Sequence, residues 1–282
     1  MYSISFIGAG NLAFRLSLAL HQAGHRIEFI LNRSHENGIK LQNVLAKNGS
    51  QAQFTDDPSK LLSSDIILLA VSDSAIAEYV DHFSKIIRER RELTLQKDGA
   101  YAPPLFLHSS GATDMSVFEE LKTDNYGVFY PLMTLSKSKG IDFNIVPFIL
   151  EASSEYVKQV LKELAVSLKS EYIFTSSHER LKLHTAAVFS TNFVNHMLTI
   201  AFEISGDAHN YLLPTTMESI RKCFLLSPDK VQTGPALRGD IQTMQKHLDI
   251  LDELGMTQEK ELYEIISKSI IERKDELQDK TE

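Results

Sequence analysis

The sequence is poor in cysteine, in positive charge and in long apolar runs. Its single cysteine, Cys223, excludes a disulfide framework within the chain and a cysteine metal cluster, and we assign no metal ligands. The 282 residues carry 29 Lys and Arg against 37 Asp and Glu, and this formal net charge of −8 argues against nucleic acid or an anionic membrane as the main partner. No signal peptide or transmembrane stretch is evident, because the first residues lead directly into a predicted strand. We therefore expect a cytoplasmic protein.

The length and the hydrophobic pattern predict two domains of different class. Hydrophobic residues make up 43% of the chain, which is enough for sizeable cores. Apolar strand patterns alternate with helical patterns as far as Ser176, which predicts an α/β domain with a doubly wound sheet over residues 1–176. No strand pattern follows, and helical patterns cover residues 178–204, 211–226, 241–251 and 258–277. We expect an all-helical second domain over residues 177–282.

A glycine turn lies between the first predicted strand and the first helix. The apolar run 4–7 is followed by Gly8, Ala9, Gly10, Asn11 and Leu12, and then by a helical pattern. In this context the glycines allow a tight turn and let backbone amides approach a dinucleotide pyrophosphate at the positive end of the helix dipole. We predict that these five residues bind a dinucleotide. The alternative is a bare strand-to-helix turn that binds nothing.

The end of the second predicted strand indicates which dinucleotide is bound. Residues 26–31 are strand-like and end in Asn32, Arg33 and Ser34, at the position that contacts the adenosine ribose in such folds. An acid there would accept a hydrogen bond from a free 2′-hydroxyl, whereas a guanidinium, an amide and a hydroxyl suit a 2′-phosphate. The sequence therefore favours NADP over NAD. The alternative is a polar turn in which Ser34 caps the next helix.

Two further strand ends carry polar residues that a dinucleotide would reach. Val71 ends the buried strand pattern 65–71, and Ser72 and Asp73 follow it. These three residues are predicted to lie beside the ribose and diphosphate, although Asp73 is also a common helix cap. His108, Ser109 and Ser110 follow the strand pattern 105–107 and are predicted to lie near the nicotinamide ring. His108 is alternatively a structural hydrogen-bonding residue.

The second predicted domain opens with polar residues on an otherwise apolar helix. Arg180, His184, Thr191 and Asn195 share one stripe of an ideal helix, with Asn192 at its edge. Buried polar groups cost about 1–3 kcal/mol each unless paired, so such a stripe usually faces a cleft or an interhelical network. Further along the chain, Arg238 lies in a loop framed by glycine and proline, where its guanidinium could hold a carboxylate or phosphate.

These motifs together resemble a family of two-domain oxidoreductases. The resemblance rests on the glycine turn, on residues 108–111, 130–132, 184–187 with Asn192, and 234–240. It points to Rossmann-like NADP oxidoreductases with a C-terminal helical domain of unknown function, within the 6-phosphogluconate dehydrogenase, hydroxyacid dehydrogenase and pyrroline carboxylate reductase group. The hydroxyacid dehydrogenases carry a lysine and an asparagine one turn apart on the linking helix. This chain has Lys182 but Ala186, so the lysine mechanism does not carry over.

The resemblance and the residues lead to one functional hypothesis. We expect an NADP-dependent enzyme that moves a hydride between the nicotinamide and a small carbonyl or imine substrate in a cleft between the domains. His184 would exchange the proton, Asn192 would hold the polarised atom and Ser110 would orient the nicotinamide or substrate. Arg238 would bind a substrate acid, and Asn195 is also expected to contact the substrate. The alternative is a non-catalytic NADP sensor, which the missing lysine and asparagine pair leaves open.

We also expect a homodimer through the C-terminal helices. The family resemblance implies it, and a small helical domain has a limited core of its own. An apolar stripe such as Leu248, Leu251 and Leu254 could bury surface against a second subunit.

Overall fold

The computed structural model describes residues 1–96 and 101–279 of the chain. The chain divides into two compact units, Met1–Val188 and Phe189–Glu282. The predicted change of class at 176/177 coincides with the start of helix α5 (Ser177–Ala187). This helix belongs to the first unit, so the division between the units falls after it.

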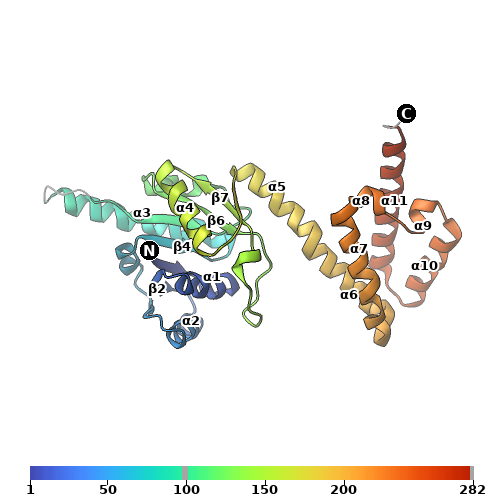
Figure 1. Ribbon diagram of the computed structural model, residues 1–282, viewed down its shortest axis with the longest axis horizontal. Helices are drawn as coiled ribbons and strands as arrows, with labels where there is room; N and C mark the ends of the chain where they lie inside the picture. Colours follow the sequence, from blue (N-terminus) through green and yellow to red (C-terminus); the bar gives the residue numbers. More distant parts are fainter. Residues whose placement is uncertain (97–100, 280–282) are drawn as a thin grey trace. The chain divides into compact units, whose positions relative to one another are not determined.

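The first unit is built on an eight-stranded sheet with the order β3-β2-β1-β4-β5-β6-β7-β8 (Figure 1). The strands are β1 (Ser3–Ile7), β2 (Arg26–Leu31), β3 (Gln53–Thr55), β4 (Ile66–Leu69), β5 (Leu105–His108), β6 (Tyr126–Pro131), β7 (Phe148–Ala152) and β8 (Tyr172–Phe174). Neighbouring strands from β3 to β6 pair in parallel, which puts their carboxyl ends at one edge of the sheet. The predicted doubly wound α/β fold is confirmed.

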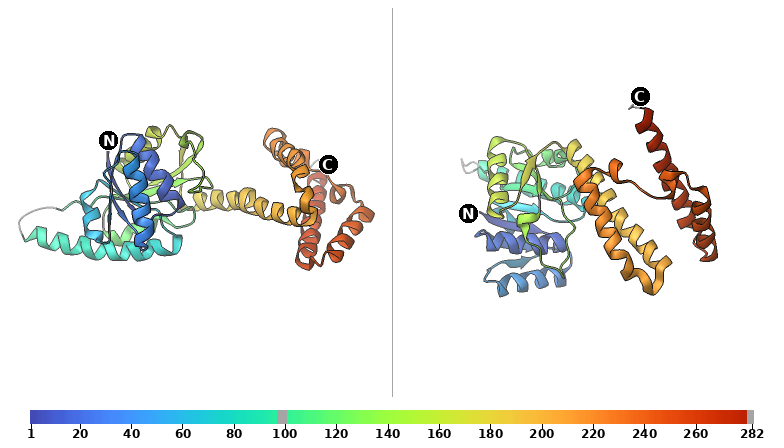
Figure 2. Two further views of the ribbon diagram at one scale, coloured as in Figure 1. Left: turned by 90° about the horizontal axis from the view of Figure 1, so that it is seen from below. Right: turned by 45° about the vertical axis from the view of Figure 1, so that its right-hand side comes forward.

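Helices cover both faces of this sheet (Figures 1 and 2). Helices α1 (Asn11–Gln22), α2 (His35–Lys47) and α4 (Glu155–Ser167) contribute their buried apolar residues to one core cluster. Helix α3 (Asp73–Leu95) and the 3₁₀ segments η1 (Pro58–Ser63) and η2 (Met115–Leu121) pack on the other cluster. Because the central strands are covered on both sides, they are mostly apolar, and every residue of β1, β4 and β5 is buried.

The last two strands depart from the parallel pattern. β7 pairs antiparallel with β6, and β8 pairs in parallel with β7. A parallel neighbour needs a crossover connection that is usually a helix. Residues 132–147 contain only the short 3₁₀ turn η3 (Phe143–Ile145) and no crossover helix. The chain therefore runs back as β7 directly beside β6, in the opposite direction.

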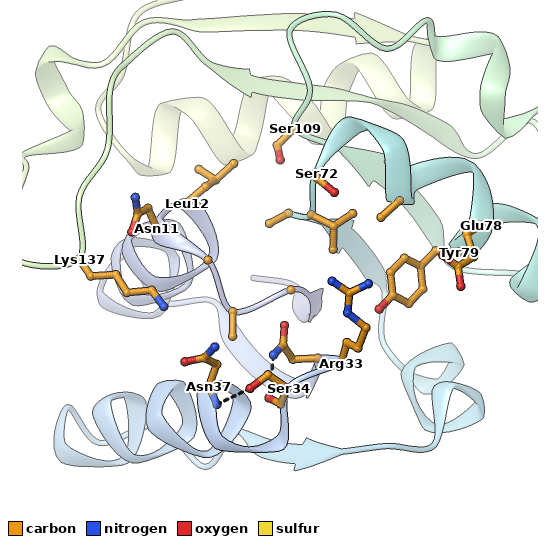
Figure 3. Close-up of a pocket in the computed structure, with 17 residues that line it drawn as sticks. Asn11, Leu12, Arg33, Ser34, Asn37, Ser72, Glu78, Tyr79, Ser109 and Lys137 are labelled. Atoms are coloured by element: carbon orange, nitrogen blue, oxygen red, sulfur yellow. Dashed lines mark hydrogen bonds between the residues drawn. The ribbon is translucent and has the colours of Figure 1, made fainter.

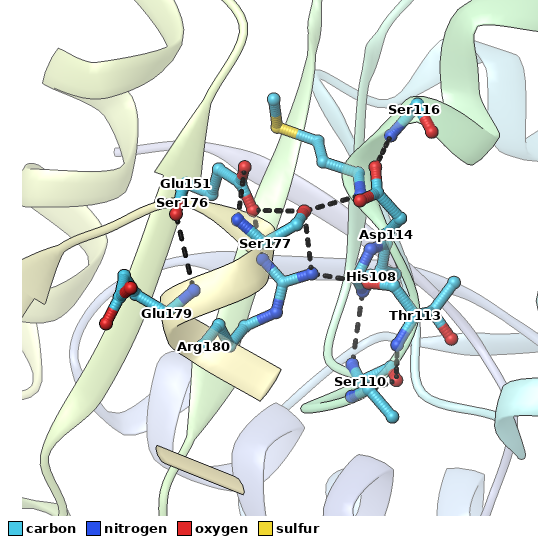
Figure 4. A network of polar contacts seen from close by, with 12 residues as sticks. His108, Ser110, Thr113, Asp114, Ser116, Glu151, Ser176, Ser177, Glu179 and Arg180 are labelled. Carbon is cyan, nitrogen blue, oxygen red and sulfur yellow. Dashed lines mark hydrogen bonds and ion pairs between the residues drawn. The ribbon is translucent and has the colours of Figure 1, made fainter. Parts of the chain in front are cut away.

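Helix α5 is fixed to the first unit by a buried ion pair (Figure 4). The Arg180 side chain is fully buried, and its guanidinium pairs with Glu151 of β7 and donates to the Thr113 carbonyl oxygen. Ser177 donates to the same carboxylate through its backbone N–H and its hydroxyl, each at 2.8 Å. A buried charge with these partners holds the helix in one orientation, because moving it would leave the charge unpaired.

All the secondary-structure elements described in the second unit are helical. It contains most of the π-helical segment η4 (Val188–Phe193), followed by α6 (Val194–Ser205), η5 (Gly206–Leu212), α7 (Leu213–Leu226), α8 (Pro228–Val231), α9 (Pro235–Arg238), α10 (Ile241–Glu253) and α11 (Thr257–Asp279). Within this unit α9, α10 and α11 contact one another around the buried residues Ala236 and Leu251. In the described part of the chain, no helix has the length and apolar character needed to span a bilayer.

His108, the last residue of β5, is fully buried. Its Nδ1 accepts a hydrogen bond from the Ser110 N–H at 3.2 Å, and its Nε2 has no partner among the described residues. Burial, reinforced by the nearby Arg180 charge, lowers the pKa of His108 to about 3. The imidazole is therefore neutral in the folded state at ordinary pH, as expected of a structural hydrogen-bonding residue.

Acidification should destabilise the fold before the carboxylates titrate. The unfolded chain binds a proton at His108 near its ordinary pKa of 6.5, whereas the folded chain does so only near 3. The contribution of neutral His108 to the free energy of unfolding is thus fully present above about pH 6.5. It is lost as the pH falls below that value, at roughly 1 kcal/mol per pH unit. The lowered pKa of His25, caused by burial, adds in the same direction. Denaturant unfolding between pH 7 and pH 5 measures this slope.

The variant His108→Asn is the matched control for that slope. An asparagine side chain can still accept from the Ser110 N–H but does not titrate. We expect a shallower pH dependence in this variant. An unchanged slope would show that His108 is not the group responsible.

Candidate functional site

The glycine turn follows β1 and cannot carry a side chain at its first position. Gly8 has φ +109°, and a Cβ there would lie 2.3 Å from the Ala70 carbonyl oxygen. Gly10 is the N-cap of α1 and gives no side-chain cap, and a Cβ there would meet nothing within 4 Å. The amides of the first turn of α1 therefore face open space at the positive end of the helix dipole.

A cavity of about 530 Å³ opens at this turn (Figure 3). It is lined by Gly8, Ala9, Gly10, Asn11, Leu12, Asn32, Arg33, Ser34, Asn37, Ala70, Val71, Ser72, Ala75, Glu78, Tyr79, Ser109 and Lys137. The structure thus brings together eleven of the thirteen residues predicted to bind the cofactor. The two that do not line the cavity are Asp73 and His108.

The residues after β2 have both ligand-facing and structural roles. Ser34 caps α2 by accepting from the Asn37 N–H at 3.4 Å, and Asn32 donates its side-chain N–H to the Ser34 carbonyl oxygen at 2.7 Å. Arg33 is exposed, and its guanidinium lies on the side of the cavity that carries Tyr79 (Figure 3). Burial raises the pKa of Tyr79, while the charge of Arg33 opposes that shift. Arg33 is therefore the freest of the three for an anion.

The strand ends at β4 and β5 complete the edge of the cavity. Ser72 is the N-cap of α3 without a side-chain cap bond, and Asp73 is the first residue of that helix. The Ser109 hydroxyl donates to the Leu69 carbonyl oxygen at 3.1 Å. The Ser110 hydroxyl oxygen accepts from the N–H groups of Ala112 at 3.1 Å and Thr113 at 2.8 Å. Ser110 therefore holds its own loop and keeps only its O–H as a donor.

The loop that begins with Ser109 leads to a pair of titratable side chains. The Tyr130 hydroxyl and His184 Nδ1 are 2.9 Å apart, and their rings meet edge to face. A Cβ on Gly111 would come within 2.6 Å of His184 Nδ1 and 2.9 Å of the Tyr130 ring. Burial raises the pKa of Tyr130, and the negative charge of Asp73 adds to the shift. His184 is thus fixed by Gly111 and Tyr130 within the first unit.

The helical stripe predicted around His184 does not run on evenly. Val188–Phe193 forms a π-helix, which changes the register between α5 and α6, so the ideal-helix stripe was wrong as drawn. Asn192 accepts from the Thr191 hydroxyl at 2.9 Å, and the Asn195 carbonyl oxygen accepts from Thr199 at 3.2 Å. Asn192, Asn195 and Arg238, the last residue of α9, belong to the second unit. Their proposed roles stay predictions.

Sequence reasoning missed six residues that line the cavity and one member of the histidine pair. Ala75, Glu78 and Tyr79 lie on one face of α3, and their spacing of three and four residues could have indicated this. Asn37 lies in the first turn of α2, where a side chain near the strand end was also predictable. Ala70 precedes the predicted Val71. Tyr130 lay in a motif used only for the resemblance, and Lys137 lies in a connection without a pattern.

Three features of the cavity fit a dinucleotide. The first turn of α1 presents amides without a side-chain cap, the space over Gly10 is open, and Arg33 offers an exposed guanidinium at the end of β2. The amides suit the pyrophosphate, the open space over Gly10 lets the pyrophosphate come close to them, and Arg33 suits the ribose end of the ligand. The described residues contain no group of three or more His, Cys, Asp or Glu placed to hold a metal ion.

Comparisons with known proteins give the family. Residues 3–90 match the family model for the NADP oxidoreductase coenzyme F420-dependent domain, and residues 146–270 match a domain of unknown function, DUF2520. A candidate NADP oxidoreductase from Bacteroides fragilis shares 34% identity with a TM-score of 0.80, over 96% of this chain and 98% of that one. No curated protein matches the chain.

Two more distant solved structures share the fold. An imine reductase from Streptomyces aurantiacus is 11% identical with a TM-score of 0.63, over 95% of both chains. A pyrroline-5-carboxylate reductase from Coxiella burnetii is 18% identical with a TM-score of 0.54, over 97% of both chains. The match to the Bacteroides fragilis protein, at 34% identity over nearly the full length of both chains, shows membership of the same family and not only a shared fold. The chain therefore belongs to the NADP oxidoreductase family represented by the Bacteroides fragilis protein, and it joins an NADP oxidoreductase domain to a C-terminal DUF2520 domain.

Proposed function

We propose that the protein is a cytoplasmic NADP-dependent oxidoreductase that transfers a hydride between the nicotinamide and a small carbonyl or imine substrate. Family membership already implies a nicotinamide cofactor and oxidoreductase chemistry. The observation that carries the rest is the cavity at the carboxyl edge of the sheet, with uncapped amides on one side and Arg33 on the other. In this proposal residues 1–176 bind the cofactor, and residues 177–282 serve the substrate and the dimer.

The preference for NADP over NAD rests on Arg33. Of the residues that line the cavity, Glu78 is the one acid, and it lies on α3 and not at the end of β2. A ribose-binding acid is therefore missing from its usual place, while a guanidinium is present that can hold a phosphate with two parallel hydrogen bonds. Asn32 and Ser34 support this part of the chain through their internal hydrogen bonds.

The variant Arg33→Ala should weaken NADPH binding by about tenfold to a hundredfold and leave NADH binding nearly unchanged, because it removes a charged partner of the 2′-phosphate. Titration of the purified protein, followed by NADPH fluorescence, measures this. Arg26→Ala is the matched control, because Arg26 lies at the other end of β2 and pairs with Glu28. Equal losses for both nucleotides would contradict the assignment of Arg33.

The proton transfer is assigned to His184. The bound cofactor would supply or accept the hydride. The Tyr130 oxygen can accept a hydrogen bond from His184 Nδ1–H in both protonation states of the ring, which leaves Nε2 as the atom that exchanges a proton with the substrate. Asn192 would hold the polarised oxygen or nitrogen, Ser110 would donate its O–H to the nicotinamide or substrate, and Arg238 with Asn195 would bind a substrate acid. A cleft between the domains remains the proposed place of the reaction.

The variant His184→Gln should lower kcat by about a hundredfold or more with little change in NADPH affinity, because it removes the general acid and base. A panel of keto acids and cyclic imines, followed by NADPH oxidation, first identifies a substrate. His178→Gln is the control, since His178 is an exposed histidine on the same helix. NADPH binding by the wild-type protein without turnover of any compound would instead favour the sensor hypothesis.

The proposed homodimer is supported by the surface of α6 and α7. Neither helix has a buried residue, and their exposed apolar side chains include Phe202, Met217, Phe224 and Leu225. Apolar helices of this kind are normally covered in the functional protein. Leu251, from the stripe expected to form the interface, is instead buried within its own unit. We therefore place the dimer contact on α6 and α7.

The variant Phe224→Glu should convert the dimer to a monomer. The Phe224 side chain is 86% exposed in the single chain, so the charge disturbs a partner contact and not the fold of the chain itself. Light scattering after size exclusion measures the mass. Tyr156→Glu, at a 59% exposed aromatic residue of α4, is the control and should leave the mass unchanged. A monomeric wild-type protein would contradict the dimer.

A further inference from the structure

The connection between β6 and β7 reaches the dinucleotide cavity. We call residues 132–147 the strap; they leave the sheet at β6, and the Leu132 N–H donates to the Pro147 carbonyl oxygen at 2.9 Å, which closes the base. Lys137 of the strap lines the cavity, although it belongs neither to the glycine turn nor to an end of the parallel strands. Figure 3 shows its side chain extending from the strap toward Asn37, across the cavity from Arg33.

The strap is tied to the phosphate-binding helix by one arginine. Arg15 lies one turn after Asn11 on α1, and its Nε donates to the Ser136 carbonyl oxygen at 2.8 Å. A terminal N–H of the same guanidinium donates to the carbonyl oxygen of Lys137 itself. The planar fork thus holds two consecutive carbonyls, which fixes the backbone of Lys137 beside the glycine turn. The Arg15 guanidinium is engaged with these carbonyl oxygens. The positive charge that the strap brings to the cavity is therefore the ammonium of Lys137.

Lys137 brings a positive charge to the lining of the cavity. None of the ion pairs among the described residues includes it, whereas Lys40, Lys85 and Lys158 each pair with an acid on their own helix. The lining of the cavity holds two cations, Arg33 and Lys137, against the single acid Glu78. An ammonium carried by a held backbone segment beside open backbone amides is a site for an anionic oxygen.

We propose that Lys137, positioned by Arg15, binds a phosphate of the dinucleotide, so that the strap is a second phosphate-binding element opposite Arg33. This inference rests on the proposed function. Because the side chain extends toward Asn37, at the start of the helix that Ser34 caps, the 2′-phosphate is the group it meets. The cofactor would thus be held by a cation on each side, one from the end of β2 and one from the strap.

The test is nucleotide binding by the full chain. Lys137→Ala should weaken NADPH binding about tenfold and weaken NADH binding less, because the variant loses one charged partner of the phosphate. The difference between wild type and variant should shrink as salt rises from 50 to 500 mM, since screening weakens exposed charge pairs. Lys139→Ala is the matched control, an exposed lysine of the same strap that does not line the cavity.

A second variant tests the role of Arg15 separately from that of the Lys137 ammonium. Arg15→Met removes the tie to the strap but not Lys137, and it should reduce NADPH affinity in the same direction while the thermal midpoint stays near that of wild type. Weaker binding of both nucleotides by Lys137→Ala would move the contact to the pyrophosphate and still support the site. Wild-type affinity in Lys137→Ala overturns the inference while the proposed function stands. A wild-type protein that binds neither nucleotide overturns both.

Discussion

The close approach of Gly8 to the Ala70 carbonyl oxygen is the constraint on which the rest of the site depends. No side chain fits between β1 and the end of β4 at this point, so the backbone turns tightly there. Helix α1 then starts from Gly10, which has no side chain to cap the first amides. The parallel pairing of β1, β2, β4 and β5 then brings their carboxyl ends to the same edge. The glycine turn, Arg33 and Ser109 lie at this edge because each comes just after the end of one of these parallel strands.

A second constraint acts through the buried Arg180. Its pairing with Glu151 holds α5 against β7, and His184 follows one turn later on the same helix. Tyr130, from the end of β6, and Gly111, from the loop after β5, then fix the imidazole. The first unit therefore carries a positioned histidine as well as the cavity. A buried charge is costly when it is unpaired, so the Arg180–Glu151 pair defines the orientation of α5.

Much of this arrangement was predictable from local patterns, and the remainder depends on tertiary packing. Gly8, Gly10 and Arg33 stand at motif positions, so the turn and the strand end could be assigned before the fold was known. The spacing of a single helix could not reveal the π segment at Val188–Phe193, and no pattern showed that β7 pairs antiparallel with β6. Lys137 lines the cavity from a connection without a pattern, and Arg15, distant in sequence, holds its carbonyl oxygen. Contacts of this kind leave no periodic signal.

Calorimetric titration of the wild-type protein with NADP⁺ and NAD⁺ measures whether the glycine turn and the cations around it bind a dinucleotide. We expect heat of binding for both nucleotides and tighter binding of NADP⁺, since only NADP⁺ carries the additional phosphate. The absence of heat for either nucleotide, or equal affinity for the two, would contradict this expectation.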